Sequence, residues 1–132
     1  MTADVSKAMD RTKGQLEDAL SKSILQFEKD YIGRGPQSIR TYIVEDLIVV
    51  RLRDALTVAE QKLIESPDGA SLVKQMREKL LEESRLLLTQ IVHQMTGTKV
   101  VSMVSSVDIE RAERILLFTL DTNLSRKLGG TR

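Results

Sequence analysis

The sequence contains no cysteine and a single histidine among its 132 residues. Without cysteine the chain can form no disulfide, thiolate metal site, iron–sulfur cluster or cysteine nucleophile. His93 alone supports little imidazole chemistry, because a helical metal site needs a second ligand one turn away. The positions three and four residues from it hold poor metal ligands: Thr89, Gln90, Thr96 and Gly97. We therefore expect a buried or interfacial histidine, no cofactor and no enzymatic activity.

Aromatic residues and a charge excess of either sign are also scarce. Aromatics make up 3% of the chain, with no Trp, which disfavours a surface on which nucleic-acid bases stack. The net charge is +1, so any affinity for polyanions must come from a local cluster. The longest apolar runs are Leu47–Val50 and Ile115–Phe118, far shorter than the roughly 20 residues of a membrane span. Charged residues interrupt Met1–Leu20, which predicts no signal peptide and a cytoplasmic protein.

The remaining composition is that of a globular domain, with 41% hydrophobic and 30% charged residues. Its length predicts one domain over residues 1–132. We expect a frayed helix start at 1–12 and a mobile tail at 123–132, where two adjacent glycines follow a polar stretch.

Three helices are predicted by apolar spacing and capping patterns. A narrow stripe indicates a long N-terminal helix that ends at Gly33-Arg34-Gly35-Pro36. The stripe consists of Met9, Thr12, Leu16, Leu20, Ile24, Phe27 and Tyr31. Such a helix needs a second surface to cover the stripe, and a second copy of the chain would supply it, so we predict a homodimer. Thr57–Glu60 is a capping box that opens a short helix to about Glu65.

The third helix, about Ala70 to Met95, carries a broad apolar face and ends at Gly97. That face comprises Leu72, Val73, Met76, Leu80, Leu87, Leu88, Ile91, Val92 and Met95. We interpret its methionines as packing residues.

Two β-hairpins are predicted between and after these helices. Ser38–Val44 and Leu47–Arg53 are β-branched runs joined by Glu45-Asp46. Side-chain alternation places Ile39, Thr41, Ile43, Ile48, Val50 and Leu52 on the core face. Lys99–Val107 and Arg114–Asp121 form the second hairpin. The order of elements predicts an α+β fold in which two antiparallel hairpins form a sheet and the helices pack on it.

The opposite face of the first hairpin is rich in arginine and is our main candidate site. In the predicted register Arg40 lies opposite Arg51, Arg53 lies diagonally, and Tyr42 shares the face. Like charges directly opposite each other destabilise a sheet, so something must compensate them. The compensating group is either an anionic ligand or partner, because guanidinium binds phosphate and carboxylate, or an acidic side chain of a neighbouring helix or second protomer. Arg34 is a minor candidate for the same basic surface.

Three other polar features favour structural interpretations. The glycines around Arg34 lack the lysine and preceding strand of a phosphate-binding loop, so we expect them to end a helix. Acidic Asp108, Glu110 and Glu113 alternate with Arg111 and Arg114, which indicates a salt-bridged, solvated loop. The serines of the third strand, Ser102, Ser105 and Ser106, have no nearby base in the sequence to activate them as nucleophiles.

Two segments resemble a known family. They are GRGPQSIRTYIVEDLIVVRLRDALTVAEQKLIES, and TGTKVVSMVSSVDIERAERILLFTLD after the third helix. The distinctive motifs are the Gly-Arg-Gly-Pro turn, VVRL-x-x-x-LT-x-x-E at Val49–Glu60, and Thr96-Gly97 before two strands. Over about residues 10–124 the chain is similar to small bacterial proteins labelled the C component of a sodium-translocating, membrane-potential-generating system, or MpsC. The resemblance implies a soluble accessory of a membrane system and carries no catalytic residues over.

We therefore expect a non-enzymatic accessory or regulatory protein, a dimer that binds a protein partner or an anionic ligand. Arg40, Tyr42, Arg51 and Arg53, with Arg34, are the expected recognition residues. The first alternative is a nucleic-acid-binding module that uses the same basic face, and the second is a small enzyme.

Overall fold

The computed structural model describes residues 11–129. Its elements follow the predicted order of helix, hairpin, short helix, long helix and hairpin, with a further short helix at the end. In chain order they are α2 (Lys13–Phe27), the π-helical turn η1 (Glu28–Ile32), β1 (Ser38–Val44), β2 (Leu47–Arg53), α3 (Val58–Leu63), α4 (Pro67–Thr96), β3 (Val100–Asp108), β4 (Glu113–Leu120) and α5 (Leu124–Lys127).

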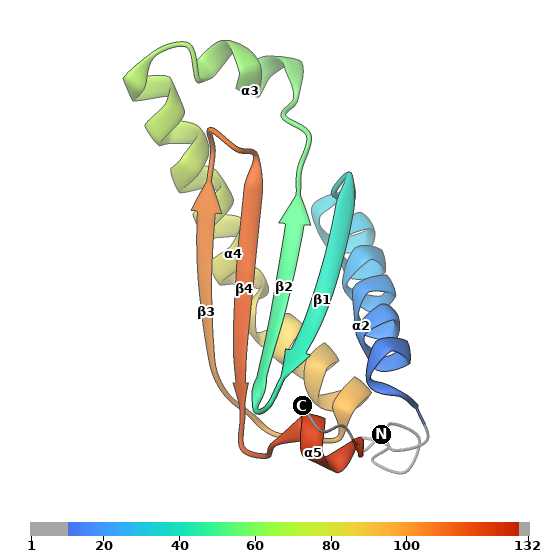
Figure 1. The fold of residues 1–132 in the computed structure, drawn as a ribbon. Helices are drawn as coiled ribbons and strands as arrows, with labels where there is room; N and C mark the ends of the chain where they lie inside the picture. The colour runs from blue at the N-terminus through green and yellow to red at the C-terminus, as the bar shows by residue number, and fades with distance from the viewer. Residues whose placement is uncertain (1–10, 130–132) are drawn as a thin grey trace.

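The four strands form one antiparallel sheet in the order β1-β2-β4-β3. Helices α2 and α4 lie on one face of this sheet, and none of the helices drawn covers the other (Figure 1). The α+β prediction is confirmed. Each hairpin packs against the helix that precedes it, α2 against β1 and α4 against β3, whereas α3 packs against α4 beyond the strand ends.

Side-chain caps fix where the helices begin. The Thr12 hydroxyl accepts the N–H of Gln15, and the Gln15 side chain accepts the N–H of Thr12. The predicted capping box at Thr57 and Glu60 is present in the same form. Thr12 is therefore a cap and not a member of the apolar stripe. The predicted Met9 lies outside the described residues, as do 1–8, 10 and 130–132.

Glycines end the two long helices. Gly33 has φ 103° and Gly97 has φ 72°. Both lie in the left-handed region, which glycine enters without a Cβ clash. The predicted ends of both helices are confirmed. Helix α4 begins at Pro67, three residues before its predicted start, because Ser66 accepts the N–H of Gly69 and proline suits the first helical position.

The predicted register of the first hairpin is confirmed at every pair, from Val44 opposite Leu47 to Ile39 opposite Leu52. Glu45 adopts φ 58° in the two-residue turn. The core lies between the sheet and the two long helices. Of the predicted inward residues, Ile43, Ile48, Val50 and Leu52 belong to it, Ile39 packs against it half-buried, and Thr41 is buried as a polar residue. Its other members are Leu16, Leu20, Ile24, Val73, Leu81, Leu88, Val92, Met103, Val107, Ile109, Leu116, Phe118, Leu120 and Leu124.

The apolar stripe of α2 is therefore covered within the chain by β1 and α4. A buried hydrogen bond of 2.8 Å between the hydroxyls of Ser21 and Thr41 joins α2 to β1. The argument that this stripe requires a second copy of the chain loses its basis.

The apolar face of α4 is narrower than predicted. Val73, Leu81, Leu88 and Val92 are buried, whereas the predicted core residues Leu72, Met76, Leu80 and Leu87 are exposed. The first turns of α4 extend beyond the strand ends (Figure 1), so part of the predicted face has no strand to cover.

The end of the chain differs from the predicted mobile tail. Leu124–Lys127 form α5, in which Leu124 and Ser125 are buried. The Ser125 hydroxyl accepts the N–H of Glu45 at 2.9 Å, which joins α5 to the turn of the first hairpin. Within residues 11–129, none of the helices combines the length and the apolar character that a membrane span requires.

Candidate functional site

The uncovered face of the sheet carries the predicted recognition residues, and we call it the open face. Its apolar members are Tyr42, Val44, Leu47, Val49, Val104, Ile115 and Leu117, which the strand registers place side by side. Tyr42, Val44 and Val104 are 43%, 51% and 60% exposed. Exposed large apolar side chains that adjoin one another on one face are typical of an interaction surface.

The arginines of the open face are only partly compensated. Arg40 lies opposite Arg51, as predicted. The Arg51 guanidinium donates to the carboxylate of Glu113 on the neighbouring strand β4. Among the described residues Arg40 and Arg53 form no ion pair, and both are exposed. The compensating acid thus lies in the sheet itself, and it leaves two of the three arginines available to a partner.

Arg34 does not belong to the open face. Its guanidinium donates to the carbonyl of Ala55, on the loop that follows β2. It lines a cavity on the helix side, together with residues of η1, α3 and α4. The structure therefore separates Arg34 from Arg40, Tyr42, Arg51 and Arg53.

The sequence analysis missed a buried ion-pair cluster at that cavity. Arg114, predicted to begin the last strand and to belong to a solvated, salt-bridged segment, is instead buried. It donates to both oxygens of Asp54, at 2.7 and 2.8 Å, and to Oε1 of Glu28 at 2.7 Å. Arg77 lies 3.1 Å from Asp54 Oδ2 and donates to both oxygens of Glu60, at 3.1 and 2.9 Å. These five residues, from η1, β4, α3, α4 and the β2–α3 loop, form the ion-pair cluster.

Two regularities in the sequence point to this cluster. Glu28 continues the spacing of four residues through Leu20 and Ile24, so it must face the sheet like the rest of that stripe. Arg114 precedes Leu116 by two residues on β4 and therefore shares its inward face. A charged residue at a core position is the signal that could have identified both.

Every carboxylate of the cluster is matched by guanidinium donors. Burial alone disfavours the Arg114 cation, but hydrogen bonds and charge attraction from Asp54 and Glu28 outweigh burial and raise the pKa of Arg114. Burial also opposes ionisation of Glu60, yet the hydrogen bonds from Arg77 and the Thr57 N–H outweigh it, so the pKa of Glu60 is lowered. Both groups stay charged at neutral pH, which suits a structural ion-pair network more than proton transfer.

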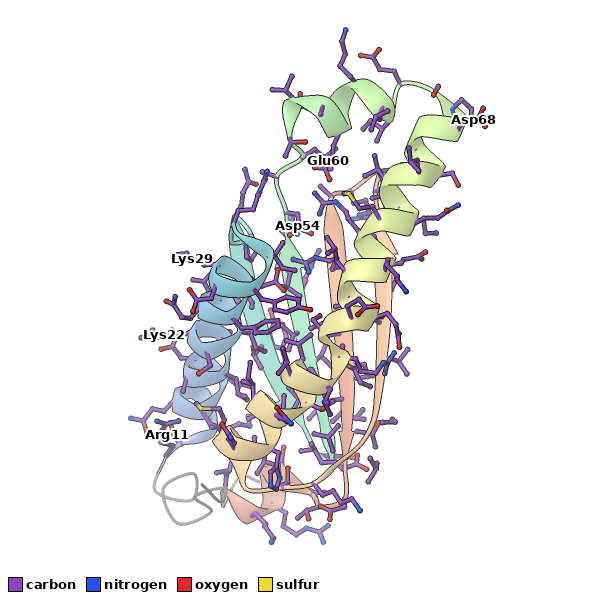
Figure 2. The ribbon with its side chains drawn as sticks, turned by 180° about the vertical axis from the view of Figure 1, so that it is seen from behind. Arg11, Lys22, Lys29, Asp54, Glu60 and Asp68 are labelled. Carbon is purple, nitrogen blue, oxygen red and sulfur yellow. The ribbon has the colours of Figure 1, made fainter. Side chains whose placement is uncertain are left out.

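The cavity beside the cluster has a volume of about 210 Å³. Its apolar wall is formed by Ile32 of η1 and by Met76, Leu80 and Leu81 of α4. Figure 2 shows Asp54 and Glu60 in the space between α2 and α4, on the side of α3. Met76 is half exposed on this wall and is not the core residue that the sequence predicted.

The other candidate residues have local roles. His93 is exposed, and its Nδ1 lies 2.7 Å from the Thr98 carbonyl oxygen. Of the two expected positions, buried or interfacial, the buried one is therefore wrong, and the interfacial one stays a prediction. Across residues 11–129, no group of three His, Asp or Glu side chains is arranged to hold a metal ion.

Comparison with known proteins gives one family. Residues 12–122 match the family model described as "Na+-translocating membrane potential-generating system (MpsC)". The uncharacterized protein YbcI of Bacillus subtilis (strain 168) is 39% identical over 120 residues, which cover 91% of this chain and 97% of YbcI. The uncharacterized protein YrhF of the same organism is 27% identical over 105 residues, which cover 79% of this chain and 86% of YrhF. No solved structure matches the chain significantly.

Proposed function

The chain belongs to the MpsC family, and on that premise we propose that it is a non-enzymatic accessory protein that binds a protein partner through its open face. The observation that carries this proposal is the uncovered apolar surface of the sheet beside Arg40 and Arg53, which form no ion pair within residues 11–129. The membrane-potential-generating system for which the family is named would supply the partner.

The dimensions of the open face support a docking role. Four strands about 4.8 Å apart, each about seven residues long at about 3.4 Å per residue, span roughly 450 Å². That area is the whole face, with its charged and polar side chains included, and it is comparable with the largest apolar patches of typical monomers, which measure about 300–600 Å² and are often functional. The exposed side chains of Tyr42 and Val104 lie within it.

The charges beside the apolar surface indicate the chemistry of the partner. Arg40 and Arg53 lie where β1 begins and β2 ends, and Val44 and Leu47 lie at the opposite ends of these strands. A complementary surface would therefore carry an apolar centre with carboxylates on one side. Arginine forks bind carboxylates with paired hydrogen bonds, which would fix the orientation of the partner.

The same face is less well suited to nucleic acid. Glu113 pairs with Arg51 and also lies 3.8 Å from Arg111, so a carboxylate stands among the cations. Polyanion binding depends on several uncompensated cations, because each contacted phosphate releases counterions. A protein surface that combines apolar side chains with carboxylates can cover the apolar centre and pair with both arginines.

Site-directed photo-cross-linking tests the proposal. A photoreactive amino acid replaces Tyr42 in cells that make the protein, and Glu78, exposed on α4, is replaced in a matched control. We expect a discrete cross-linked protein at position 42 that is absent at position 78 and is lost when Arg40→Glu and Arg53→Glu are added. Equal products at both positions, or a nucleic-acid product at position 42, would contradict the proposal.

A further inference from the structure

The two edges of the sheet are protected to different degrees. On the β1 edge, the N–H of Ile43 donates to the carboxylate of Glu17 at 2.8 Å, and Arg40 places a charge on the strand. On the β3 edge, the stretch Val100–Val107 reads VVSMVSSV and contains neither a charged residue nor a proline. Arg85 donates to the carbonyl of Met103 there.

An edge with so few protecting features is a template for another strand. Apart from the Met103 carbonyl, which accepts from Arg85, its outward N–H and C=O groups are open to pairing, and natural proteins block such edges with lysine, proline, bulges or covering elements. The irregularity of β3 is confined to Val100–Ser102, and from Ser102 to Asp108 the strand pairs with β4 without interruption. About seven residues of regular edge therefore remain, with a length of roughly 24 Å.

Apolar side chains flank this edge. Val101 and Val104 of β3 are exposed, and Leu86 of α4 is 68% exposed. A shallow hollow of about 270 Å³ lies between α4 and β3, lined by Arg85, Leu86, Thr89 and Val100–Met103. An added strand would find both backbone partners and apolar surface at the same place.

We propose that β3 pairs antiparallel with β3 of a second copy of the chain, so that two four-stranded sheets become one continuous sheet of eight strands. The twofold axis lies perpendicular to the sheet near Val104. Leu86 of each copy approaches the boundary between the sheets from the helix side. This dimer forms through the backbone edge of β3 and shares only Val104 with the open face, so both open faces stay exposed on the same side.

Charge favours a second copy as the occupant. Lys99 directly precedes β3 and Asp108 ends it, and both are exposed. Antiparallel pairing centred near Val104 brings Lys99 of each copy beside Asp108 of the other, and the strand itself carries no charge between them. An arrangement in which one surface binds its own twofold image closes at two copies and does not extend into a fibre.

The absence of cysteine makes a direct test possible. Val104→Cys, oxidised at micromolar concentration, should give a disulfide-linked dimer, because facing residues of a non-hydrogen-bonded antiparallel pair have Cα atoms about 4.5 Å apart. Val44→Cys is the matched control, an exposed valine on the opposite edge strand, and should remain largely monomeric. Equal cross-linking of the two variants would overturn the proposal.

Disruption of the edge provides the second measurement. By light scattering after size exclusion, the wild type should have twice the chain mass of 14.8 kDa. Ser105→Lys, on the β3 edge, should have the mass of one chain with an unchanged circular dichroism spectrum. Val44→Lys should stay dimeric. A wild-type monomer, or a dimer that Ser105→Lys does not affect, refutes edge pairing, whereas cross-linking at Tyr42 reports the open face separately.

Discussion

Arg114 and Asp54 are 60 residues apart in sequence and meet through two parallel hydrogen bonds of 2.7 and 2.8 Å. The pair joins the start of β4 to the loop that leads from β2 into α3. Glu28 extends it to the end of the N-terminal helix, and Arg77 extends it to α4. One group of charges thus holds together the end of the molecule where the two long helices diverge (Figure 2).

Arg114→Met should be strongly destabilising. The change keeps an apolar stem but removes the guanidinium, and it leaves the carboxylate of Glu28, 2% exposed, without its cation. Breaking one partner of a buried pair costs about 3–5 kcal/mol. Urea denaturation followed by circular dichroism measures the loss. Lys22→Met is the control, because its pair with Asp18 is exposed and should contribute at most about 0.5 kcal/mol. A loss below about 1 kcal/mol for Arg114→Met would contradict this role.

Glu60 should make the stability of the protein depend on acidity. Its pKa is lowered in the folded state from the ordinary value of 4.5, so the ionised form is the one that stabilises the fold. That stabilisation is complete above pH 4.5 and is lost as the pH falls through the folded-state pKa. Glu60→Gln should therefore be less stable than the wild type at pH 7 by about 1–3 kcal/mol.

The informative quantity is the difference in stability between the wild type and Glu60→Gln, because the other carboxylates titrate in both proteins. Urea midpoints measured from pH 7 to pH 3 should converge as the wild type loses the charged Glu60–Arg77 interaction. A gap that stays constant over the whole range would mean that the ionisation of Glu60 contributes nothing.

Local rules were sufficient to predict the first hairpin. Its register follows from the alternation of apolar side chains and from a two-residue connection, and both lie within 16 consecutive residues, Ser38–Arg53. The capping box at Thr57 and the terminal glycines Gly33 and Gly97 are equally local, since each acts on backbone groups within one turn of a helix.

The ion-pair cluster could not be assembled in the same way. Glu28 and Arg114 are 86 residues apart, and only the packing of α2 over the sheet decides that they meet. The sequence could show that each occupies an inward position. It could not show that their partners are Asp54 and Arg77. The exposure of Leu72 and Met76 in the first turns of α4 has a similar explanation, because the length of the sheet decides how much of the helix is covered (Figure 1).

Gly33→Ala should weaken the end of the N-terminal helix. Gly33 has φ 103°, and a left-handed backbone costs a residue with a Cβ about 1–2 kcal/mol. Gly14→Ala is a matched control within the same helix, because a Cβ added there meets nothing within 4 Å. It should stabilise the protein by about 0.4–1 kcal/mol. Relative to the wild type, the midpoint of thermal or urea unfolding should thus fall for Gly33→Ala and rise for Gly14→Ala. A rise for both variants would show that Gly33 is not held in the left-handed region.

Arg40 and Arg51 face each other, yet their removal should have opposite effects on stability. Arg40→Ser deletes an exposed cation that repels Arg51, so the free energy of unfolding should rise by about 0.2–1 kcal/mol. Arg51→Ser also removes the repulsion, but it leaves the largely buried carboxylate of Glu113 without its cation. The net effect should be a lower free energy of unfolding. Chemical denaturation at low and high salt checks both, because screening reduces the gain from Arg40→Ser. If Arg40→Ser destabilises the protein, then Arg40 is a structural residue. If it stabilises the free protein while reducing cross-linking at Tyr42, the arginine is retained for binding at the expense of stability.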